Sequence, residues 1–443
     1  MMQLRILKSG TPATGRFMAT IRARRGGADD ARINDTVAKI IADVRRRGDV
    51  ALIGYTQKFD GVKLTPRTLR VTAAELAAAP KKLPARDRRA LELAARRIAR
   101  FHRKTLERPF AFVDNLGMRL GQLVRPLRRV GLYVPGGMGA YPSSVLMNAI
   151  PARVAGVLEI VMVAPPSREG ERDSVTAAAA IAGVTEYYRV GGAQAVAALA
   201  YGTKTIRAVD KIVGPGNAYV QAAKRMVYGV TDIDKMAGPS EVLVIADASA
   251  RAEWIAADLI AQAEHGSGDE SAILLTPSAR LAQAVERALE SALATLPRAA
   301  AVRRVLDRRG AAIIVKDLEE AFALSNEIGP EHLELEIRDA RRWLPRISAA
   351  GAVFLGAMSP APLGDYLAGP NHVLPTGGSA RFASPLGAYD FLKRTSIIEA
   401  SARAARKLGP AVAHLARMEG FEGHARSMEL RSRGNQRGGV KRG

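Results

Sequence analysis

Residues 128–166 place a buried strand, a turn, a helix and a second buried strand in succession. RRVGLYVPGG (128–137) is an apolar run that ends in proline and glycine, SSVLMNAIPARVAGV (143–157) has helical spacing of its apolar residues, and EIVMVAPP (159–166) is an apolar run closed by proline. Apolar strands that alternate with helices of roughly 10–15 residues are typical of a parallel sheet covered by helices on both faces. This stretch therefore predicts an α/β fold.

The alternation of strands and helices recurs along most of the chain. It continues as YYRVGG and AQAVAALAYG, then as AVDKIVGPG and NAYVQAAKRMVYG. A second run consists of predicted strands at 241–247, 271–277, 311–316, 333–337 and 351–356, separated by predicted helices at 251–265, near 278–297 and near 317–328. Residues 35–107 and the chain after about Ala388 have helical spacing instead. We therefore predict two α/β modules, joined near 235–241, between helical N- and C-terminal regions.

The composition narrows the range of functions. The 443-residue chain has no cysteine, which excludes disulfides and thiolate metal sites. Its formal net charge is +23, but the arginine-rich runs lack interleaved aromatic residues, and residues 235–272 carry seven acids against one Lys and one Arg. This distribution favours a cation site over a nucleic-acid groove. The longest uncharged run, residues 130–152, is interrupted by three prolines and four glycines, so no membrane helix is expected.

The chain termini give weaker signals. The N-terminus lacks the apolar core of a signal peptide, which favours a cytoplasmic location. Six basic residues precede the first acid, Asp29, so a transit peptide stays an alternative. The C-terminus ends in RSRGNQRGGVKRG, which has little to bury and is expected to form a mobile basic tail.

Two pairs of residues have the chemistry of a catalytic site. Glu331 and His332 precede the strand in IGPEHLELEI (328–337), where an acid and a base suit proton transfer. A solvated loop before an edge strand is the alternative. Gln262 and His265, in AQAEH, share one face at the end of a predicted helix and are suited to hold a metal. The alternative there is a histidine favoured by the C-terminal end of the helix dipole.

Loop segments carry further candidates. LGDYLAGPNHVLPTGG contains Asp365, a hard oxygen ligand, with an Asx turn as the alternative. MEGFEGHARS contains Glu419 and His424, with a helix terminus bearing solvated acids as the alternative. VGG (190–192) and GPGN (214–217) each follow a strand and open a helix, where ligands dock in open α/β sheets; simple tight turns are the alternative. None of these segments is a self-sufficient zinc motif, so the residues alone predict an unspecified metalloenzyme.

Long motifs make the chain resemble the histidinol dehydrogenase family over roughly residues 36–430. The motifs are GLYVPGGMGAYPSSVLMNAIPARVAGV, VGGAQAVAALAYGT, VDKIVGPGNAYV, MAGPSEVLVIAD, AQAEH, GPEHLE, GDYLAGPNHVLPTGG and EGFEGHARS. The resemblance implies a two-step, four-electron oxidation of L-histidinol through L-histidinaldehyde to L-histidine, the last steps of histidine biosynthesis. Two NAD molecules would be reduced in turn.

The resemblance also implies roles for individual residues. One zinc ion per subunit would be held by Gln262, His265, Asp365 and His424. His332 would accept the alcohol proton, and Glu331 would activate the water that adds to the aldehyde. Substrate contacts would come from Ser240, Gln262, His265, His332, Asp365, Glu419 and His424. NAD contacts would come from Tyr133, Gln194 and Asn217.

The family fold consists of two incomplete Rossmann-like domains in a homodimer, which implies a domain division here. The ranges would be an N-terminal arm at 1–28, a larger domain with metal and catalytic residues at 29–132 and 242–385, an NAD-binding domain at 133–241, and a helical C-terminal segment at 386–443 with its basic tail from about 431. The C-terminal segment would reach the partner subunit, so that Glu419 and His424 would complete the partner's site.

Other functions stay open from the sequence. A related zinc- and NAD-dependent dehydrogenase of another small amino- or sulfo-alcohol is the strongest, but such relatives tend to lose the substrate-gripping residues, and Ser240, His332 and Glu419 are present. A zinc hydrolase with Glu331 as its base would work without NAD. A nucleic-acid-binding protein would bind DNA in a salt-dependent way. Neither of the last two explains both the glycine-rich loops and the Glu–His pair.

Overall fold

The computed structural model describes residues 4–24, 30–136, 140–166, 171–236, 238–265 and 268–433, apart from the side chains of residues 171 and 172. The chain forms two compact units, and unit 1 contains residues 1–105 and 127–391 while unit 2 contains residues 106–126 and 392–443. Parts of the predicted N-terminal arm (1–3 and 25–28) and most of the predicted basic tail (434–443) lie outside the described residues. No helix in the described ranges is long and apolar enough to cross a membrane.

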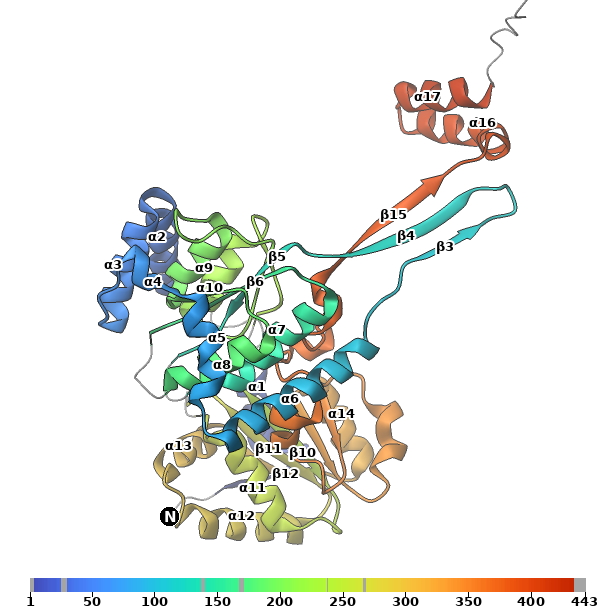
Figure 1. Ribbon diagram of the computed structural model, residues 1–443. Helices are drawn as coiled ribbons and strands as arrows, with labels where there is room; N and C mark the ends of the chain where they lie inside the picture. Colours follow the sequence, from blue (N-terminus) through green and yellow to red (C-terminus); the bar gives the residue numbers. More distant parts are fainter. Residues whose placement is uncertain are drawn as a thin grey trace, which may run out of the picture. The chain divides into compact units, whose positions relative to one another are not determined.

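Unit 1 contains two six-stranded sheets (Figure 1). In spatial order, sheet 1 consists of β2 (Arg70–Val71), β7 (Glu186–Arg189), β6 (Glu159–Ala164), β5 (Arg129–Tyr133), β8 (Lys211–Val213) and β9 (Asp232–Ile233). All neighbours pair in parallel except the antiparallel edge strand β2. The five parallel strands follow the order 3-2-1-4-5 of a doubly wound fold, which places a switch point between β5 and β8.

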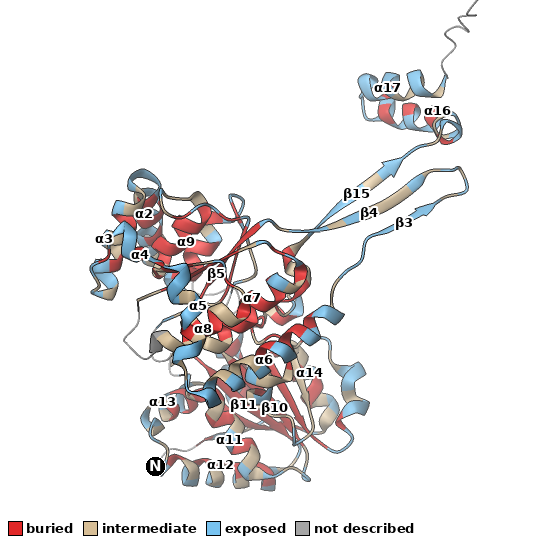
Figure 2. Ribbon diagram, viewed as in Figure 1, coloured by how far each residue is buried: buried red, intermediate tan, exposed pale blue. Residues whose placement is uncertain are grey.

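Helices cover both faces of sheet 1. One face packs against α2 (Ala31–Arg47), α3 (Asp49–Asp60), α9 (Gly192–Tyr201) and α10 (Ala218–Val227). On the other side, α7 (Pro142–Ala155) contacts β5 and β6, and α8 (Glu171–Ala182) packs between α7 and α5 (Ala73–Lys82). The strands have apolar residues on both faces because both are buried, as Figure 2 shows for β5.

Sheet 2 is parallel throughout and repeats the same strand order. In spatial order it consists of β1 (Arg5–Lys8), β12 (Gly310–Ile314), β11 (Ser271–Thr276), β10 (Glu241–Ala246), β13 (His332–Glu336) and β14 (Ala352–Leu355). One face packs against α11 (Ala252–Ala263), α12 (Ala279–Leu293) and α13 (Ala299–Arg309). The other packs against α1 (Pro12–Arg22), α14 (Leu318–Ile328) and the 3-10 helix η1 (Ala340–Arg346). Its switch point lies between β10 and β13.

Shorter or more peripheral helices complete unit 1. They are α4 (Pro66–Leu69), α6 (Ala85–Lys104), α15 (Ala361–Leu363), the π-helical turn η2 (Gly364–Ala368), and the 3-10 turns η3 (Ser379–Arg381) and η4 (Ala388–Phe391). Helix α6 packs against both α7 and η2.

Unit 2 combines an antiparallel sheet with a pair of helices. The sheet order is β15 (Leu392–Glu399), β4 (Arg119–Pro126) and β3 (Phe110–Val113). Figure 1 shows these strands side by side as a long ribbon. Helices α16 (Ala402–Met418) and α17 (Glu422–Ser432) pack on each other through three buried alanines, Ala413, Ala416 and Ala425.

The predicted α/β class, with its two Rossmann-like modules and helical flanks, is confirmed, but several local predictions are wrong. After the short 3-10 turn η4 (Ala388–Phe391), the chain forms strand β15 and becomes α-helical only at Ala402. Pairing of β15 with β4 stabilises it, and no local pattern reveals a partner so distant in sequence. A further helix, α13, follows the predicted helix near 278–297. The domain boundaries given above stay a prediction.

Two other histidines differ in their burial. His102 is buried on α6 although arginines surround it in the sequence, and burial lowers the pKa of its imidazole to about 4. His414 is exposed on α16, because the contact with α17 is made through Ala413 and Ala416. Neither residue was assigned a functional role.

A buried ion pair supports the loop that follows β8. The side chains of Lys224 and Asp234 are 0% and 1% exposed and contact each other directly. Lys224 also donates to the Gly214 carbonyl over 2.9 Å, and Asp234 accepts from the Gly214 N–H over 2.9 Å. The pair therefore fixes the glycine that begins the loop leading to Asn217.

We predict that Lys224→Met destabilises unit 1 by about 3 kcal/mol, because it leaves the Asp234 carboxylate buried without its counter-ion. Chemical unfolding followed by circular dichroism measures the change. Lys39→Met, at an exposed position on α2, is the matched control. Equal stability of the Lys224→Met and control proteins would contradict the supporting role of the pair.

Candidate active site

The Glu331–His332 pair lies at the amino end of β13, next to the amino end of β10. The parallel register pairs His332 with Val242, so Glu331 and Glu241 enter their strands side by side. The Glu241 N–H donates to Glu331 Oε2 over 2.9 Å, and His332 Nδ1 lies 3.0 Å from the Glu241 carbonyl oxygen. Backbone groups of one strand thus hold both candidate catalytic side chains of the other.

The hydrogen bond at Nδ1 decides which nitrogen of His332 is free for chemistry. A carbonyl can only accept, so Nδ1 carries a proton and Nε2 of the neutral ring has the lone pair. His332 Nε2 is buried without a hydrogen-bond partner in the described structure and lies 3.6 Å from Asp365 Oδ1. The geometry is that of a proton acceptor pointing toward the Asp365 loop.

Neighbouring charges set the protonation of the pair. Burial lowers the pKa of His332, but the carboxylates of Glu331 and Asp365 outweigh burial and raise the pKa to about 9. Burial raises the pKa of Glu331 to about 7, against the attraction of His332. His332 Nδ1 and Glu331 Oε2 are 3.7 Å apart. A carboxyl that titrates near neutrality is suited to general base catalysis.

Strand β13 is more buried than its alternating pattern predicts. All five residues from His332 to Glu336 are buried, because β13 lies between β10 and β14 and is not an edge strand. Glu334 accepts from the Ala361 N–H over 2.6 Å, and its carboxyl, which has the higher pKa of the two, donates to the Asp258 carboxylate of α11. Together with protonation, these contacts limit the cost of burying Glu334 away from water.

The predicted metal ligands of α11 differ in detail from expectation. The helix ends at Ala263, so His265 lies just beyond it and not on its last turn. His265 Nδ1 is 3.1 Å from the Gln262 carbonyl oxygen, an arrangement that leaves Nε2 available to a metal. The Gln262 side chain is buried, and its amide nitrogen has no partner among the described residues.

Asp365 lies on the π-helical turn η2, a feature that often occurs at functional sites. Burial raises the pKa of Asp365, but the histidines His332, His372 and His265 lower it by more. The net pKa is below the usual value, so the carboxyl remains ionised. His372 Nδ1 is 3.0 Å from the Asp365 carbonyl oxygen, and His372 Nε2 is 3.5 Å from Ser144 Oγ at the start of α7. This contact ties the Asp365 loop to the first turn of α7, a link that sequence spacing gave no sign of.

The donors in unit 1 fit zinc as part of a ligand set. Gln262, His265 and Asp365 supply an amide oxygen, an imidazole and a carboxylate, and the supporting observation is that His265 Nε2 is left available by the contact at Nδ1. Among described residues, no three His, Cys, Asp or Glu side chains form a complete metal cluster. A fourth donor would have to come from elsewhere.

Glu419 and His424 belong to unit 2. Glu419 is the residue that caps the C-terminus of α16, and His424 lies in the first turn of α17 with its ring 5.2 Å from that of Phe421. Both residues are exposed. Their predicted role in the site stays a prediction.

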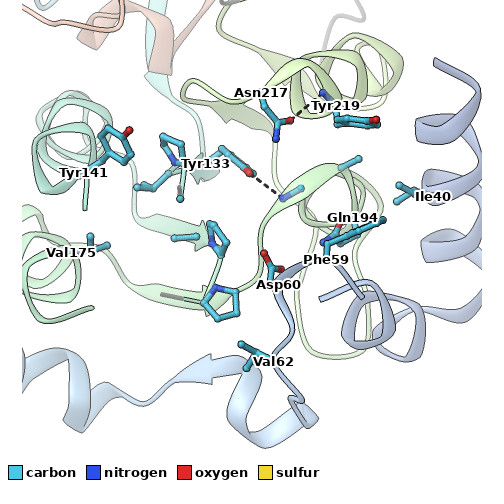
Figure 3. Close-up of a pocket in the computed structure, with 18 of the residues that line it drawn as sticks. Ile40, Phe59, Asp60, Val62, Tyr133, Tyr141, Val175, Gln194, Asn217 and Tyr219 are labelled. Carbon is cyan, nitrogen blue, oxygen red and sulfur yellow. Dashed lines mark hydrogen bonds between the residues drawn. The ribbon is translucent and has the colours of Figure 1, made fainter. Parts of the chain in front are cut away.

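A recess opens at the carboxyl ends of the strands in sheet 1. It has a volume of about 1150 Å³ and is lined by Tyr133, Gln194 and Asn217 among others (Figure 3). The Gly192 N–H donates to the Tyr133 hydroxyl over 3.0 Å, and the Asn217 side chain caps α10 by accepting from the N–H groups of Tyr219 and Val220. Gln194 Oε1 is buried without a partner in the described part of the chain. The three predicted cofactor residues thus line one pocket.

Ser240 and Arg24 lie next to Glu241, the residue whose backbone binds the Glu331–His332 pair. Ser240 directly precedes β10, and its carbonyl accepts from Ser271 over 3.1 Å. Arg24 lies 2.9 Å from the buried Glu241 carboxylate and also donates to Ser271 Oγ and the Pro239 carbonyl. The sequence gave no reason to select Arg24, since it is one of many arginines in a basic N-terminal region.

Comparison with known proteins assigns the chain to a family. A family model described as histidinol dehydrogenase matches residues 23–432. The histidinol dehydrogenase of Syntrophotalea carbinolica is 52% identical over 97% of this chain and 99% of its own length. That of Bordetella parapertussis is 53% identical over 91% of each chain. The chain belongs to the histidinol dehydrogenase family.

The structure agrees with the family assignment. A crystal structure of histidinol dehydrogenase from Elizabethkingia anophelis matches with a TM-score of 0.90 at 35% identity, over 98% of both chains. The predicted family is confirmed, and the chain is an oxidoreductase of histidine biosynthesis. These comparisons do not favour the alternative of a dehydrogenase for another small alcohol.

We predict that Glu334→Gln reduces the dependence of stability on pH. Burial and the neighbouring Asp258 raise the pKa of Glu334 from 4.5 to about 8, so the folded protein keeps a proton that the unfolded chain releases within this window. Stability should therefore fall as pH rises from 4.5 to 8 in the parent protein. Gln keeps the neutral hydrogen bonds without titrating, and a smaller fall in melting temperature is expected.

Melting temperatures at about pH 5 and about pH 8 provide the measurement. Glu290→Gln, on the exposed face of α12, is the matched control. The same loss of melting temperature in the Glu334→Gln and parent proteins would show that Glu334 holds no proton in the fold.

Proposed function

We propose that the protein oxidises L-histidinol to L-histidine through L-histidinaldehyde, using two NAD molecules and one zinc ion per subunit. The balanced reaction consumes one histidinol, two NAD⁺ and one water, and gives one histidine, two NADH and three protons. The main supporting observation is the placement of His332, with Nδ1 held by the Glu241 carbonyl and Nε2 free beside Asp365. The amino end of β13 presents the His332 base and the Glu331 carboxyl. Two consecutive oxidations can use these two groups for different proton transfers.

In the first step, His332 would accept the hydroxyl proton of histidinol at Nε2, and bound NAD would supply the hydride acceptor. The Glu241 carbonyl keeps the ring oriented and stabilises the imidazolium that results. The nearby Asp365 carboxylate contributes to the raised pKa of His332. Neutralising the Asp365 charge with a bound cation would therefore lower the pKa of His332 and favour the neutral base.

In the second step, Glu331 takes a proton from the water that adds to the aldehyde. Its pKa of about 7 makes the carboxylate available near neutral pH without making it a weak base. The Glu241 N–H holds Oε2, which leaves Oε1 as the acceptor. His332 then serves again as the base when the hydrate loses its second hydride.

Substrate binding is assigned to residues from both units. Zinc, held by Gln262, His265, Asp365 and the partner's His424, would orient the imidazole and amino nitrogens of the substrate. Ser240, His332 and Glu419 would contact the substrate directly, with Glu419 also supplied by the partner in a homodimer. The exposure of Glu419 and His424 in the single chain is compatible with this arrangement.

NAD is assigned to the pocket of sheet 1, where Tyr133, Gln194 and Asn217 would contact it. The pocket lies at the switch point of a doubly wound sheet, and the N-termini of α9 and α10 lie beside it. Backbone N–H groups at such ends favour phosphate. We extend this assignment to the domains, with 133–241 binding NAD and 29–132 plus 242–385 carrying the catalytic residues. A cytoplasmic location stays a prediction.

The overall reaction is tested by stoichiometry. We expect the purified protein to form two NADH for each histidinol consumed, with histidine as the product identified by chromatography. Formation of one NADH, with the aldehyde as the final product, would contradict the two-step proposal. Absence of any NADH with histidinol would contradict the proposed function altogether.

We predict that His332→Asn and Glu331→Gln separate the two steps. His332→Asn should nearly abolish both oxidations, because both need the base at Nε2. Glu331→Gln should spare the oxidation of histidinol to the aldehyde and slow that of the aldehyde by on the order of 10²-fold or more. Rates with histidinol and with histidinaldehyde as separate substrates provide the measurement. Equal loss of both rates in Glu331→Gln would refute the assigned division.

We predict that two inactive variants restore activity when they are mixed. His265→Ala removes a ligand from unit 1 and His424→Ala removes one from unit 2, so each homodimer lacks a complete site. A mixed dimer contains one site with both histidines, and random exchange of subunits should recover about a quarter of the parent activity. Unfolding and refolding the two variants together allows the exchange, and each variant refolded alone is the control. No recovery would place both histidines in the same chain's site.

A further inference from the structure

The proposed NAD pocket contains a single charged side chain among its described lining residues. This is Asp60, the last residue of α3, and no described Lys, Arg or His lines the pocket with it. Asp60 Oδ2 is enclosed by protein without a hydrogen-bond partner in the described ranges. Burial raises the pKa of its carboxyl, as expected for an acid with too few donors around it. The pocket therefore presents an acceptor that its own walls leave unsatisfied.

The position of Asp60 shows which part of a bound dinucleotide it would meet. Figure 3 shows its carboxylate pointing toward the middle of the pocket, between Val62 and the Tyr133 hydroxyl. Its negative charge also contributes to the raised pKa of Tyr133, about 12, which burial mainly causes. The Tyr133 hydroxyl thus keeps its proton while it accepts from Gly192. Asp60 and Tyr133 together offer an acceptor and a donor to a ligand hydroxyl.

The pocket has a reactive end and a distal end. Tyr141 lines one side and is the N-cap residue of α7, whose first turn contacts His372, the residue whose ring is 3.0 Å from the Asp365 carbonyl oxygen. The side at Tyr141 is therefore the one that faces the candidate catalytic residues. Ile40 and Phe59 line the opposite side in Figure 3, with Asp60 nearer to them.

An aromatic surface lies beside Asp60 at the distal end. The Phe59 ring stacks on Tyr55 with 5.7 Å between centroids, the Lys58 ammonium lies 5.4 Å from its centroid, and 53% of the Phe59 surface remains exposed. An exposed aromatic ring provides a platform for a flat heterocycle. If nicotinamide occupies the side near Tyr141, the adenine falls near Phe59 and the adenosine ribose falls near Asp60.

We propose that Asp60 binds the adenosine ribose through its hydroxyls and thereby selects dinucleotides without a 2′-phosphate. This inference rests on the proposed binding of NAD and adds the residue that determines cofactor specificity. A carboxylate accepts hydrogen bonds from a free ribose diol, whereas a 2′-phosphate would bring a second anion against it and offers no donor. In dinucleotide folds an acid in this role usually follows the second strand of the sheet, but here it ends a helix outside the sheet.

Titration calorimetry of the full-length protein with NAD and with NADP tests the proposal without any turnover. The parent should bind NAD more tightly than NADP. Asp60→Asn should weaken NAD binding by on the order of tenfold, because a charged hydrogen bond is lost. The preference for NAD over NADP should narrow by at least that factor, because the charge that repels the 2′-phosphate is also lost. Asp35→Asn, which removes one negative charge from the exposed face of α2, is the matched control and should keep the parent preference.

A second experiment changes the ligand and uses only the parent protein, so it does not require the Asp60→Asn protein to fold. An NAD analogue without the adenosine 2′-hydroxyl should bind the parent protein more weakly than NAD by a similar factor. An unchanged preference in Asp60→Asn, equal binding of NAD and NADP by the parent, or equal binding of the analogue and NAD would each overturn the role of Asp60. A parent protein that binds neither NAD nor NADP would overturn the proposed function, and this inference with it.

Discussion

The parallel pairing of β10 with β13 is the constraint on which the catalytic arrangement depends. It sets the backbone of Glu241 against the side chains of Glu331 and His332. The Glu241 N–H binds Glu331, and the Glu241 carbonyl binds His332. A shift of one residue in this register would turn each of these two side chains to the face opposite its present one. The buried Arg24–Glu241 contact lies on the same strand end, so the N-terminal region helps to hold it. The chemistry thus depends on main-chain geometry more than on side-chain contacts.

The two sheets share one strand order, but their candidate functional residues lie at opposite ends of the strands. In sheet 1 the pocket opens at the carboxyl ends of the strands, as in other doubly wound folds. In sheet 2 the Glu–His pair lies at the amino ends, together with Ser240 before β10 and the residues that follow α11. A helix that returns from a strand's carboxyl end delivers its last residues to the amino edge, which explains why Gln262 and His265 are found there. The repeated fold therefore places the sheet 1 pocket, the proposed NAD site, and the Glu331–His332 pair at opposite ends of their strands.

Much of the sheet architecture could be predicted because it depends on local sequence. The apolar runs at β5, β6, β10 and β11 are continuous. Tyr133 ends β5, and the glycine turns after β7 and β8 place Gln194 and Asn217 at the same edge of sheet 1. Features that depend on distant partners could not be predicted. The burial of Glu334 needs a carboxyl from α11, strand β15 needs β4, and Asp60 reaches the pocket from a helix outside the sheet. The roles of the zinc and substrate residues came from family resemblance and not from spacing.

The construction of unit 2 from two separate chain segments limits how the protein can be divided. Strand β4 comes from residues between β2 and β5 of sheet 1, and β15, which follows the last strand of sheet 2, pairs with it along eight residues. Cutting the chain after Phe391 would leave β4 with an unpaired edge, which invites pairing between chains. The helices carry little shared core beyond three alanines, while Leu415, Met418 and Leu430 are exposed. A C-terminal deletion would therefore yield an aggregation-prone protein and not a monomeric dehydrogenase module.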